Sequence, residues 1–548
     1  EQMSDLYRAI VRFNGLVKYG KTVLAPTTAM RNWQSAMFFS LANGHFDLTQ
    51  MKKSISAFRE QVSQKATGQD LKYLRHLKQL GVVYDTPYAG EMARLMEDAR
   101  MEELLSSDKG DAVRWFRKAN QLAQGFYTFG DDFWKIIGFE NEKAGLMKAG
   151  LSLQEAETEA AKRIRDTYPT YSMVGRGVQW LSRFPLAGTF VSFPSEIIRT
   201  SGDMLRTVAA DLKSDNPKLR ELGMKRAAGM VFVSAAFYSL AALSMAMAGV
   251  GDDEDEAIRD LAPEWQKNST FLYLGRDEKG NLRYFDMSFL DPYGYWKRPI
   301  TAMLRNQPWE DSLASGLRGM LEPFIGADIA AKAIFEAVAN QKENGGKVYK
   351  EKDGAINQTI DVADHLRKAL QPGVVGNVER LVKAAGDVRK SSGQPYSMED
   401  ELVALVGWRA TTIDPKTALY YRSFEFTDAV AEARKTITET LRDANEITPE
   451  DIADAKARAQ AKQEQAFKEM HRLVSAAESA GMSKMQIVQT LRLSNISQAN
   501  IGSLMRGETP DVSITPQLAA RAVRQASQMR GPEYAAEVFD RYRQARAN

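Results

Sequence analysis

The chain of 548 residues contains no cysteine, few histidines and almost no excess of either charge. Without cysteine it forms neither disulfides nor thiolate metal sites, and a cysteine nucleophile is excluded. The four histidines, His45, His76, His365 and His471, show none of the paired spacings of a metal site. We therefore expect no metal and no cofactor.

The charge balance and the missing motifs exclude further classes of protein. There are 73 basic and 70 acidic residues, a net charge of +3, which argues against a protein whose main role is to coat nucleic acid. The motifs GxxxxGK[ST], GxGxxG after a strand, HExxH and GxSxG are all missing. We expect no enzymatic activity, although a hydrolase of unknown type stays open as a third alternative.

Two short patterns resemble sites and have simpler interpretations. Glu478 and Ser479 form a Glu-Ser pair like that of lytic transglycosylases, but the pair lies at the end of a charged helix just before Gly481. The five acids at 252–256 could supply oxygen ligands to a divalent cation. They lack the turns of a calcium loop, so we interpret them as a solvated helix flank.

Helical periodicity dominates the chain, and the length exceeds the ~300 residues of a single core. The pattern predicts a mainly α fold: an extended multi-helix array with one small β-hairpin and a central hydrophobic helix. We divide the chain into five regions. The first three are a helical region at 1–173, a proline-broken apolar segment with the central hydrophobic helix at 174–251, and an acidic flank with a hairpin and an aromatic loop at 252–300. The last two are a second helical region at 301–425 and a charged spacer helix with a helical tail at 426–548.

Local signals place several of these elements. The apolar segment 27–44 reads as a helix that ends at Asn43 and Gly44. SLQE at 152–155 is a capping box. In the segment 174–208, Phe184-Pro185 and Phe193-Pro194 are expected to break the helix twice. The alternating segment 271–288 around a polar Gly-containing turn predicts the β-hairpin.

The C-terminal region has a different character. A helix that starts near Thr448 and Pro449 is rich in charge and alanine, with too few large apolar residues for its own core. We interpret it as a spacer or as a helix that lies against a partner. Ser483 and Ser497 then open two short helices with the spacing of a helix-turn-helix pair, for which plain packing is favoured over DNA binding.

The segment 227–251, AAGMVFVSAAFYSLAALSMAMAGVG, carries no charge and is preceded by Lys225 and Arg226. At about 1.5 Å per residue it reaches across the ~30 Å hydrocarbon core of a bilayer. Its serines, alanines and glycines weaken the drive into lipid and favour close helix packing. We expect it buried among neighbours in a stored form and exposed to a membrane later, with these candidate contacts: Val231, Phe232, Phe237, Leu240, Leu243 and Met245.

Four arginines are weaker candidates for contact with nucleic acid or lipid headgroups. Arg199 and Arg206 fall seven residues apart on one helix face, which is usually solvated. Arg521 and Arg524 lie in the arginine-bearing tail.

Several stretches resemble the C-terminal part of the very large internal virion proteins of tailed bacteriophages, a group that includes the ejection proteins and virion-packaged RNA polymerases of short-tailed phages. The likeness is carried by KYGKTVLAPTTAMRNWQSAMFFSLANGHFD at 18–47 and RFPLAGTFVSFPSEIIRTSGDMLR at 183–206, and by LEPFIGADIAAKAI, GGKVYKEKDGAINQ and GWRATTIDP further on. It is a likeness of pattern and order. We expect Glu1 to follow an upstream part of a longer polypeptide.

The resemblance implies a structural protein that is stored in the virion interior, ejected, and reassembled in the host cell envelope as part of a conduit for the genome. The implied partners are further copies of the chain, other ejection or portal proteins and the host membrane, with DNA as passing cargo and no small-molecule substrate. The alternative is a nucleic-acid-binding module that accompanies ejected DNA or a virion polymerase.

Overall fold

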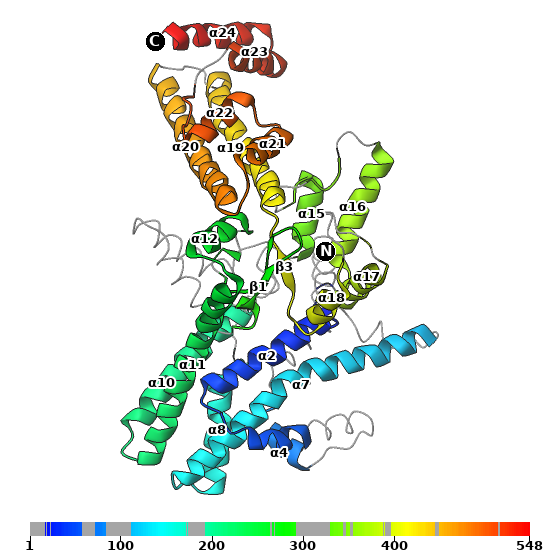
Figure 1. Cartoon of the computed structure of the whole chain (residues 1–548), viewed down its shortest axis with the longest axis vertical. Helices are drawn as coiled ribbons and strands as arrows, with labels where there is room; N and C mark the ends of the chain where they lie inside the picture. Colours follow the sequence, from blue (N-terminus) through cyan, green and yellow to red (C-terminus); the bar gives the residue numbers. More distant parts are fainter. Residues whose placement is uncertain are drawn as a thin grey trace.

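The computed structural model describes residues 17, 19–21, 23–56, 72–83, 111–170, 173, 192–263, 266–267, 269–291, 329–342, 347–350, 354–386, 388, 396–443, 449–512 and 516–547. The fold is mainly α with one small antiparallel sheet, as the sequence predicts (Figure 1). The expected aromatic loop at 292–300, the helices expected at 301–328 and Phe184-Pro185 lie outside the described residues.

The N-terminal helices form the lower part of the molecule in Figure 1. They share a first core, to which α2, α4, α7, α8, α10 and α11 contribute side chains such as Phe39, Trp134 and Val233. Helices α10 and α11 pack against each other as an antiparallel pair joined by residues 214–216. Their bounds, with the short helix η1, are α2 (Pro26–Ala42), η1 (Leu48–Gln50), α4 (Lys72–Gln79), α7 (Asp111–Lys148), α8 (Leu153–Thr167), α10 (Ser192–Lys213) and α11 (Pro217–Ala248).

The predicted hairpin is confirmed and gains a third strand. β1 (Phe271–Arg276) pairs antiparallel with β2 (Leu282–Asp286), and the carboxylate of Asp277 accepts hydrogen bonds from two backbone amides of the turn. The strand missing from the sequence prediction is β3 (Ala410–Thr412), which pairs with β2. Helix η4 (Met287–Phe289) follows β2.

The C-terminal helices form a second core in the upper part of the molecule with the sheet and with α12 (Asp252–Leu261). Its helices are α19 (Pro415–Asp443), α20 (Pro449–Ser479), α21 (Lys484–Leu493) and α22 (Gln498–Arg506). A third, smaller cluster joins α23 (Pro516–Arg530) and α24 (Pro532–Ala547) to α19 and α20. At the side lie α15 (Ile329–Ala339), α16 (Ala355–Leu370), α17 (Gly373–Ala385) and α18 (Met398–Leu405).

Helix α20 is not a free spacer. It packs along α19 and α12, and the ring of Phe467, fully buried, lies 5.0 Å from that of Phe426. The small alanines that suggested too weak a core instead let the helices approach closely, since Ala455, Ala459 and Ala477 are all buried.

Two other local interpretations need correction. Pro194 does not break a helix, because it lies in the first turn of α10, where an N–H has no helical partner to lose. Asp255 is not part of a solvated flank, since it is buried and accepts hydrogen bonds from Arg259 and Tyr273. The capping box at Ser152 and Glu155 is confirmed.

Candidate functional site

Helix α11 contains the uncharged segment and defines the candidate site. Asn216 caps its start by accepting a hydrogen bond from the Lys218 amide, and Gly249 ends it in the left-handed conformation at φ 63°. Among the described residues it is the one helix long and apolar enough to cross a membrane, and 17% of its apolar window is buried. In a single copy of the chain the helix is therefore largely exposed, so burial among neighbours, which we expect in a stored form, would have to come from other copies or partners.

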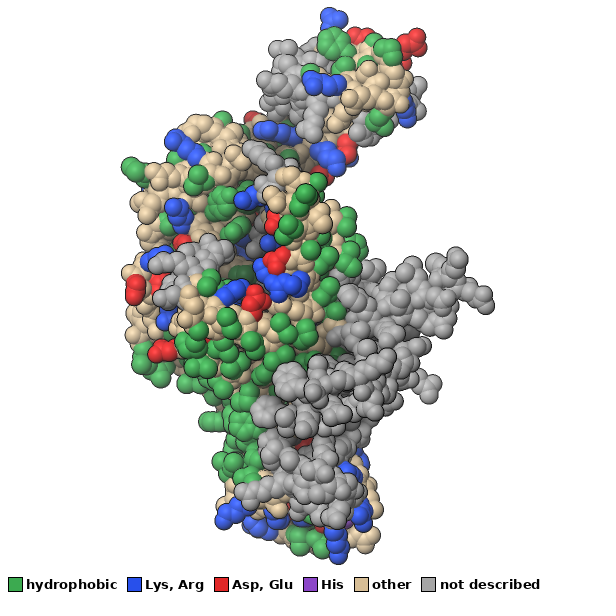
Figure 2. Space-filling view, turned by 90° about the vertical axis from the view of Figure 1, so that its right-hand side faces the viewer, with side chains coloured by type: hydrophobic (Ala, Val, Ile, Leu, Met, Phe, Trp, Pro, Cys, Tyr) green, Lys and Arg blue, Asp and Glu red, His purple; other side chains and the backbone are tan. Residues whose placement is uncertain are grey.

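The exposed side of α11 is apolar. Val231, Phe232, Leu240 and Leu243 expose between 47% and 68% of their surface. Their exposure is unusual for large apolar side chains that follow one another on one helix. Figure 2, which looks at the right-hand side of Figure 1, shows hydrophobic side chains gathered over the middle of the molecule.

Two of the expected membrane contacts point inward instead. Phe237 is buried, and its ring lies 4.7 Å from that of Phe38 on α2. Met245 is half-buried against the second core. These two side chains contact protein in this arrangement, so the exposed face is narrower than the sequence suggested.

Glycines bring the inner side of α11 close to the end of α2. A Cβ added at Gly229 would lie 2.2 Å from the Leu41 carbonyl oxygen, and one at Gly44 would lie 2.7 Å from the Lys225 backbone. Gly44 also has φ 74°, which favours glycine. The two helices can therefore touch through their backbones at this crossing.

A buried charge cluster lies at the foot of the apolar run. Arg226, 1% exposed, donates to Glu142 of α7 and, at 3.0 Å, to Asp211 of α10. Arg163 of α8 holds Asp211 with two hydrogen bonds of 2.8 and 2.9 Å and approaches Glu142 at 3.3 Å. Four helices and the segment after α2 thus meet here, because His45 in that segment also donates to Glu142 at 2.9 Å.

The surroundings fix the protonation of the cluster. Burial opposes ionisation of Glu142, but Arg226, His45 and Arg163 together hold the pKa of this carboxyl well below its usual range. Burial lowers the pKa of His45, against the opposing pull of Glu142. The imidazole is therefore neutral at pH 7, donating from Nε2 to Glu142 and accepting at Nδ1 from the Tyr168 hydroxyl at 2.9 Å.

Arg226 was expected to flank a membrane span beside Lys225. Lys225 is exposed and pairs with Glu221 at 2.8 Å, whereas Arg226 points into the first core. The reason is the helical spacing, since neighbouring residues point about 100° apart.

The four candidate arginines do not form one surface. Arg199 is half-buried between Glu196 and Asp203 and donates to carbonyls at the end of α8, so it is engaged within the protein. Arg206 is exposed and binds Asp203 at 2.8 Å. Arg524 is exposed on α23, and the side chain of Arg521 lies outside the described residues.

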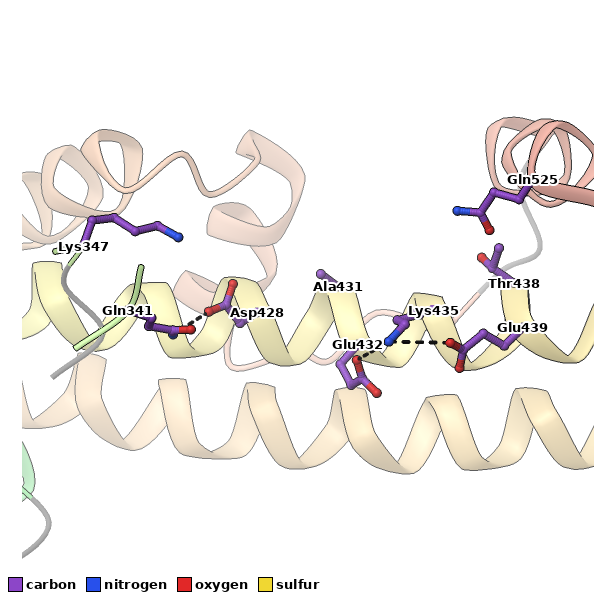
Figure 3. A pocket seen from close by; sticks show the side chains of 9 residues that line it. All are labelled: Gln341, Lys347, Asp428, Ala431, Glu432, Lys435, Thr438, Glu439 and Gln525. Carbon is purple, nitrogen blue, oxygen red and sulfur yellow. Dashed lines mark hydrogen bonds and ion pairs between the residues drawn. The ribbon is translucent and has the colours of Figure 1, made fainter. Parts of the chain in front are cut away.

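A separate cavity of about 450 Å³ lies beside α19 and has a polar lining (Figure 3). Its charges satisfy one another: Lys435 lies between Glu432 and Glu439, at 3.9 and 3.5 Å, and Asp428 accepts from Gln341 at 3.1 Å. Among the described residues no group of three or more acidic or histidine side chains could hold a metal ion. Among the lining residues that the structure describes, no nucleophile is paired with a base.

Sequence reasoning missed the charge cluster. Its members are separated by up to 181 positions, from His45 to Arg226, and they come from four different helices and the segment after α2. The one local signal was Arg226, which comes just before an uncharged run. The sequence alone does not show whether such an arginine faces solvent or the core.

No protein-family model matches the chain. Comparison with curated proteins and with solved structures yields no match either. A functional assignment therefore rests on α11 and the residues around it.

Proposed function

We propose that the chain is a structural segment of a phage ejection protein, stored in the virion and helping to form an envelope-spanning conduit for the genome after ejection. In this proposal α11 enters the host membrane, several copies assemble with other ejection or portal proteins, and the chain catalyses no reaction. The exposed apolar face of α11 is the observation that carries the proposal.

Three properties of α11 favour lipid as the occupant of this face. The run 227–251 is uncharged and long enough for a bilayer. Exposed basic residues lie before it, at Lys213, Lys218, Arg220 and Lys225, where they suit anionic headgroups. Acidic residues follow it at the start of α12. Helix α10 carries charges along its length, so it stays at the membrane surface.

A flotation assay with vesicles of phosphatidylethanolamine and phosphatidylglycerol tests this proposal. Leu240→Arg places a charge in the middle of the exposed face, which costs about 2.5 to 3.5 kcal/mol at a bilayer centre. Leu493→Arg on α21, where the side chain is 63% exposed, is the matched control. We expect the wild type and the control to float and Leu240→Arg to lose at least tenfold in bound fraction.

Failure of the wild type to float, or equal flotation of Leu240→Arg, would rule the proposal out. Cross-linking on the vesicles reports whether copies associate. The alternative, a nucleic-acid-binding module, gains support if DNA binding falls steeply with salt and is lost when residues 516–547 are removed.

A further inference from the structure

The charge cluster joins two parts of the lower half of the protein. One part, which we call the hairpin, is α10 with α11 and contributes Asp211 and Arg226. The other, which we call the body, is α2, α7 and α8 with the residues after α2, and contributes His45, Glu142 and Arg163. Every member is at least nine-tenths buried, so the cluster is shielded from water while the parts are together.

We propose that this cluster is a latch that divides into two neutral ion pairs when the hairpin leaves the body. The inference rests on the proposed function only in taking the bilayer as the partner that the released hairpin binds. The division itself depends only on the contacts within the protein.

The contacts fall into two sets. Those that cross the boundary are the bidentate pair of Arg163 with Asp211, the pair of Arg226 with Glu142, and a hydrogen bond of 3.3 Å from Arg226 to Asn43. Those within one part are Arg226 with Asp211, at 3.0 Å, and Glu142 with Arg163 and His45. Separation breaks only the first set.

Each part then keeps one positive and one negative charge. The hairpin retains Arg226 beside Asp211, and the body retains Arg163 beside Glu142, with His45 neutral. A charge left alone in an apolar site is strongly unfavourable, whereas a hydrogen-bonded pair is tolerated. The arrangement therefore permits opening without leaving an unpaired charge on either side.

The charges also determine which helices move together. If α11 left without α10, Arg226 would lose both carboxylates, and Glu142 and Asp211 would share Arg163 alone. Such a separation leaves a net charge on each side. The hairpin is therefore the unit of movement, and its Asp211–Arg226 pair would lie at the membrane interface, before the uncharged run.

The rest of the boundary suits release into lipid. One polar contact crosses it at the turn between α10 and α11, where Asn216 Nδ2 donates to the Ala149 carbonyl at 2.7 Å. Near the cluster its other contacts are apolar, Phe38 with Phe237 and Phe46 with Phe232, whose ring centroids lie 4.7 and 6.5 Å apart. Lipid tails can replace such contacts. At the other end of α10, Arg199 donates to the carbonyls of Arg165 and Tyr168, and this attachment can serve as a pivot.

A reversible cross-link tests the latch. Because the chain has no cysteine, Phe46→Cys with Phe232→Cys gives two unique thiols across the boundary, and both side chains are about half exposed. A bismaleimide with a reducible bond closes the boundary, and reductant opens it again. The control joins His76→Cys on α4 to Glu157→Cys on α8, whose native side chains lie 3.0 Å apart and do not cross this boundary.

Insertion is measured as the fraction that stays with the same vesicles after a carbonate wash. We expect the boundary cross-link to lower this fraction at least tenfold, reduction to restore it, and the control cross-link to have no effect. Equal insertion of the closed and reduced forms would overturn the latch and leave the proposed function standing. If neither the cross-linked nor the reduced protein inserts, the proposed function is ruled out. The latch is then tested by a measurement that needs no lipid.

The lipid-free measurement is hydrogen exchange of the amides at 223–237. Arg163→Lys keeps the charge but loses the bidentate hold on Asp211. Arg259→Lys is the control, since Arg259 is equally buried but pairs with Asp255 in the second core. The latch predicts at least fivefold faster exchange at 223–237 for Arg163→Lys than for Arg259→Lys. Equal rates would overturn it.

Discussion

Arg163 and Asp211 form a bidentate ion pair between α8 and α10, with Nη1–Oδ2 and Nη2–Oδ1 distances of 2.9 and 2.8 Å. Both side chains are nearly inaccessible to solvent. Asp211 also binds Arg226, the residue just before the uncharged run of α11, so buried ion pairs connect the start of that run to the first core. The stability of the first core therefore depends on charge as well as on apolar packing.

Removing one member of the cluster should be strongly destabilising. Arg226→Met leaves Glu142 and Asp211 with fewer positive partners in a buried site, at a cost of about 3 to 5 kcal/mol. Arg206→Met is the control, because Arg206 is 83% exposed and its pair with Asp203 is worth less than about 1 kcal/mol. Hydrogen exchange of α7 and α11 amides measures both, and a similar small effect for the two variants would contradict the prediction.

Acidification should weaken the first core. The pKa values of His45 and Glu142 both lie below their ordinary values of 6.5 and 4.5, so the folded state resists protons that the unfolded chain takes up. Stability is therefore fully present above pH 6.5 and falls as the pH drops, at up to about 1.4 kcal/mol per pH unit for the His45 contribution.

The variant His45→Gln isolates that contribution. It removes the group that titrates near neutrality while keeping polar atoms next to Glu142 and Tyr168. The free energy of unfolding of the first core is measured by urea titration at pH 7, 6 and 5, with hydrogen exchange of the α7 amides as the readout. It should depend less steeply on pH in the variant than in the wild type. Identical slopes would mean that the histidine is not neutral in the folded protein.

The glycine at the helix crossing should be intolerant of a side chain. Gly229→Ala places a methyl group against the backbone oxygens of Leu41 and Ala42, so the helices must separate, and we expect a loss of about 1 to 3 kcal/mol. Gly202→Ala on α10 meets nothing within 4 Å and should stabilise by about 0.5 to 1 kcal/mol. The thermal unfolding midpoint should fall for Gly229→Ala and rise for Gly202→Ala. Shifts of the same sign in both variants would contradict the prediction.

Local signals in the sequence were sufficient for the fold class and for several element boundaries. Ser152 with Glu155, Asn43 with Gly44, and the turn at Asp277 act over three or four residues, so the sequence alone reveals them. Strand β3 was missed because a three-residue strand has too little alternation to be recognised, and it forms only by pairing with β2, more than a hundred positions away.

The exposed helix was visible in the sequence, but the face it exposes was not. The composition of 227–251 specifies an apolar helix, whereas Phe237 points inward because Phe38 lies opposite it, and Phe38 comes from a distant helix. For α20 the difficulty was similar, since its alanines looked too small for a core until α19 brought Phe426 against Phe467. In both cases tertiary packing decides what the local pattern leaves open.

A resident membrane anchor can usually be cut from a chain to leave a soluble fragment, but α11 belongs to two cores at once. Val233 lies in the first core, Met245 and Ala248 pack on the second, and the Ser244 hydroxyl accepts the backbone N–H of Tyr273 in β1. Deleting the helix would open the interior of both parts of the protein. Its apolar residues therefore also stabilise the folded chain, and any movement of the helix out of the protein must release contacts with both cores.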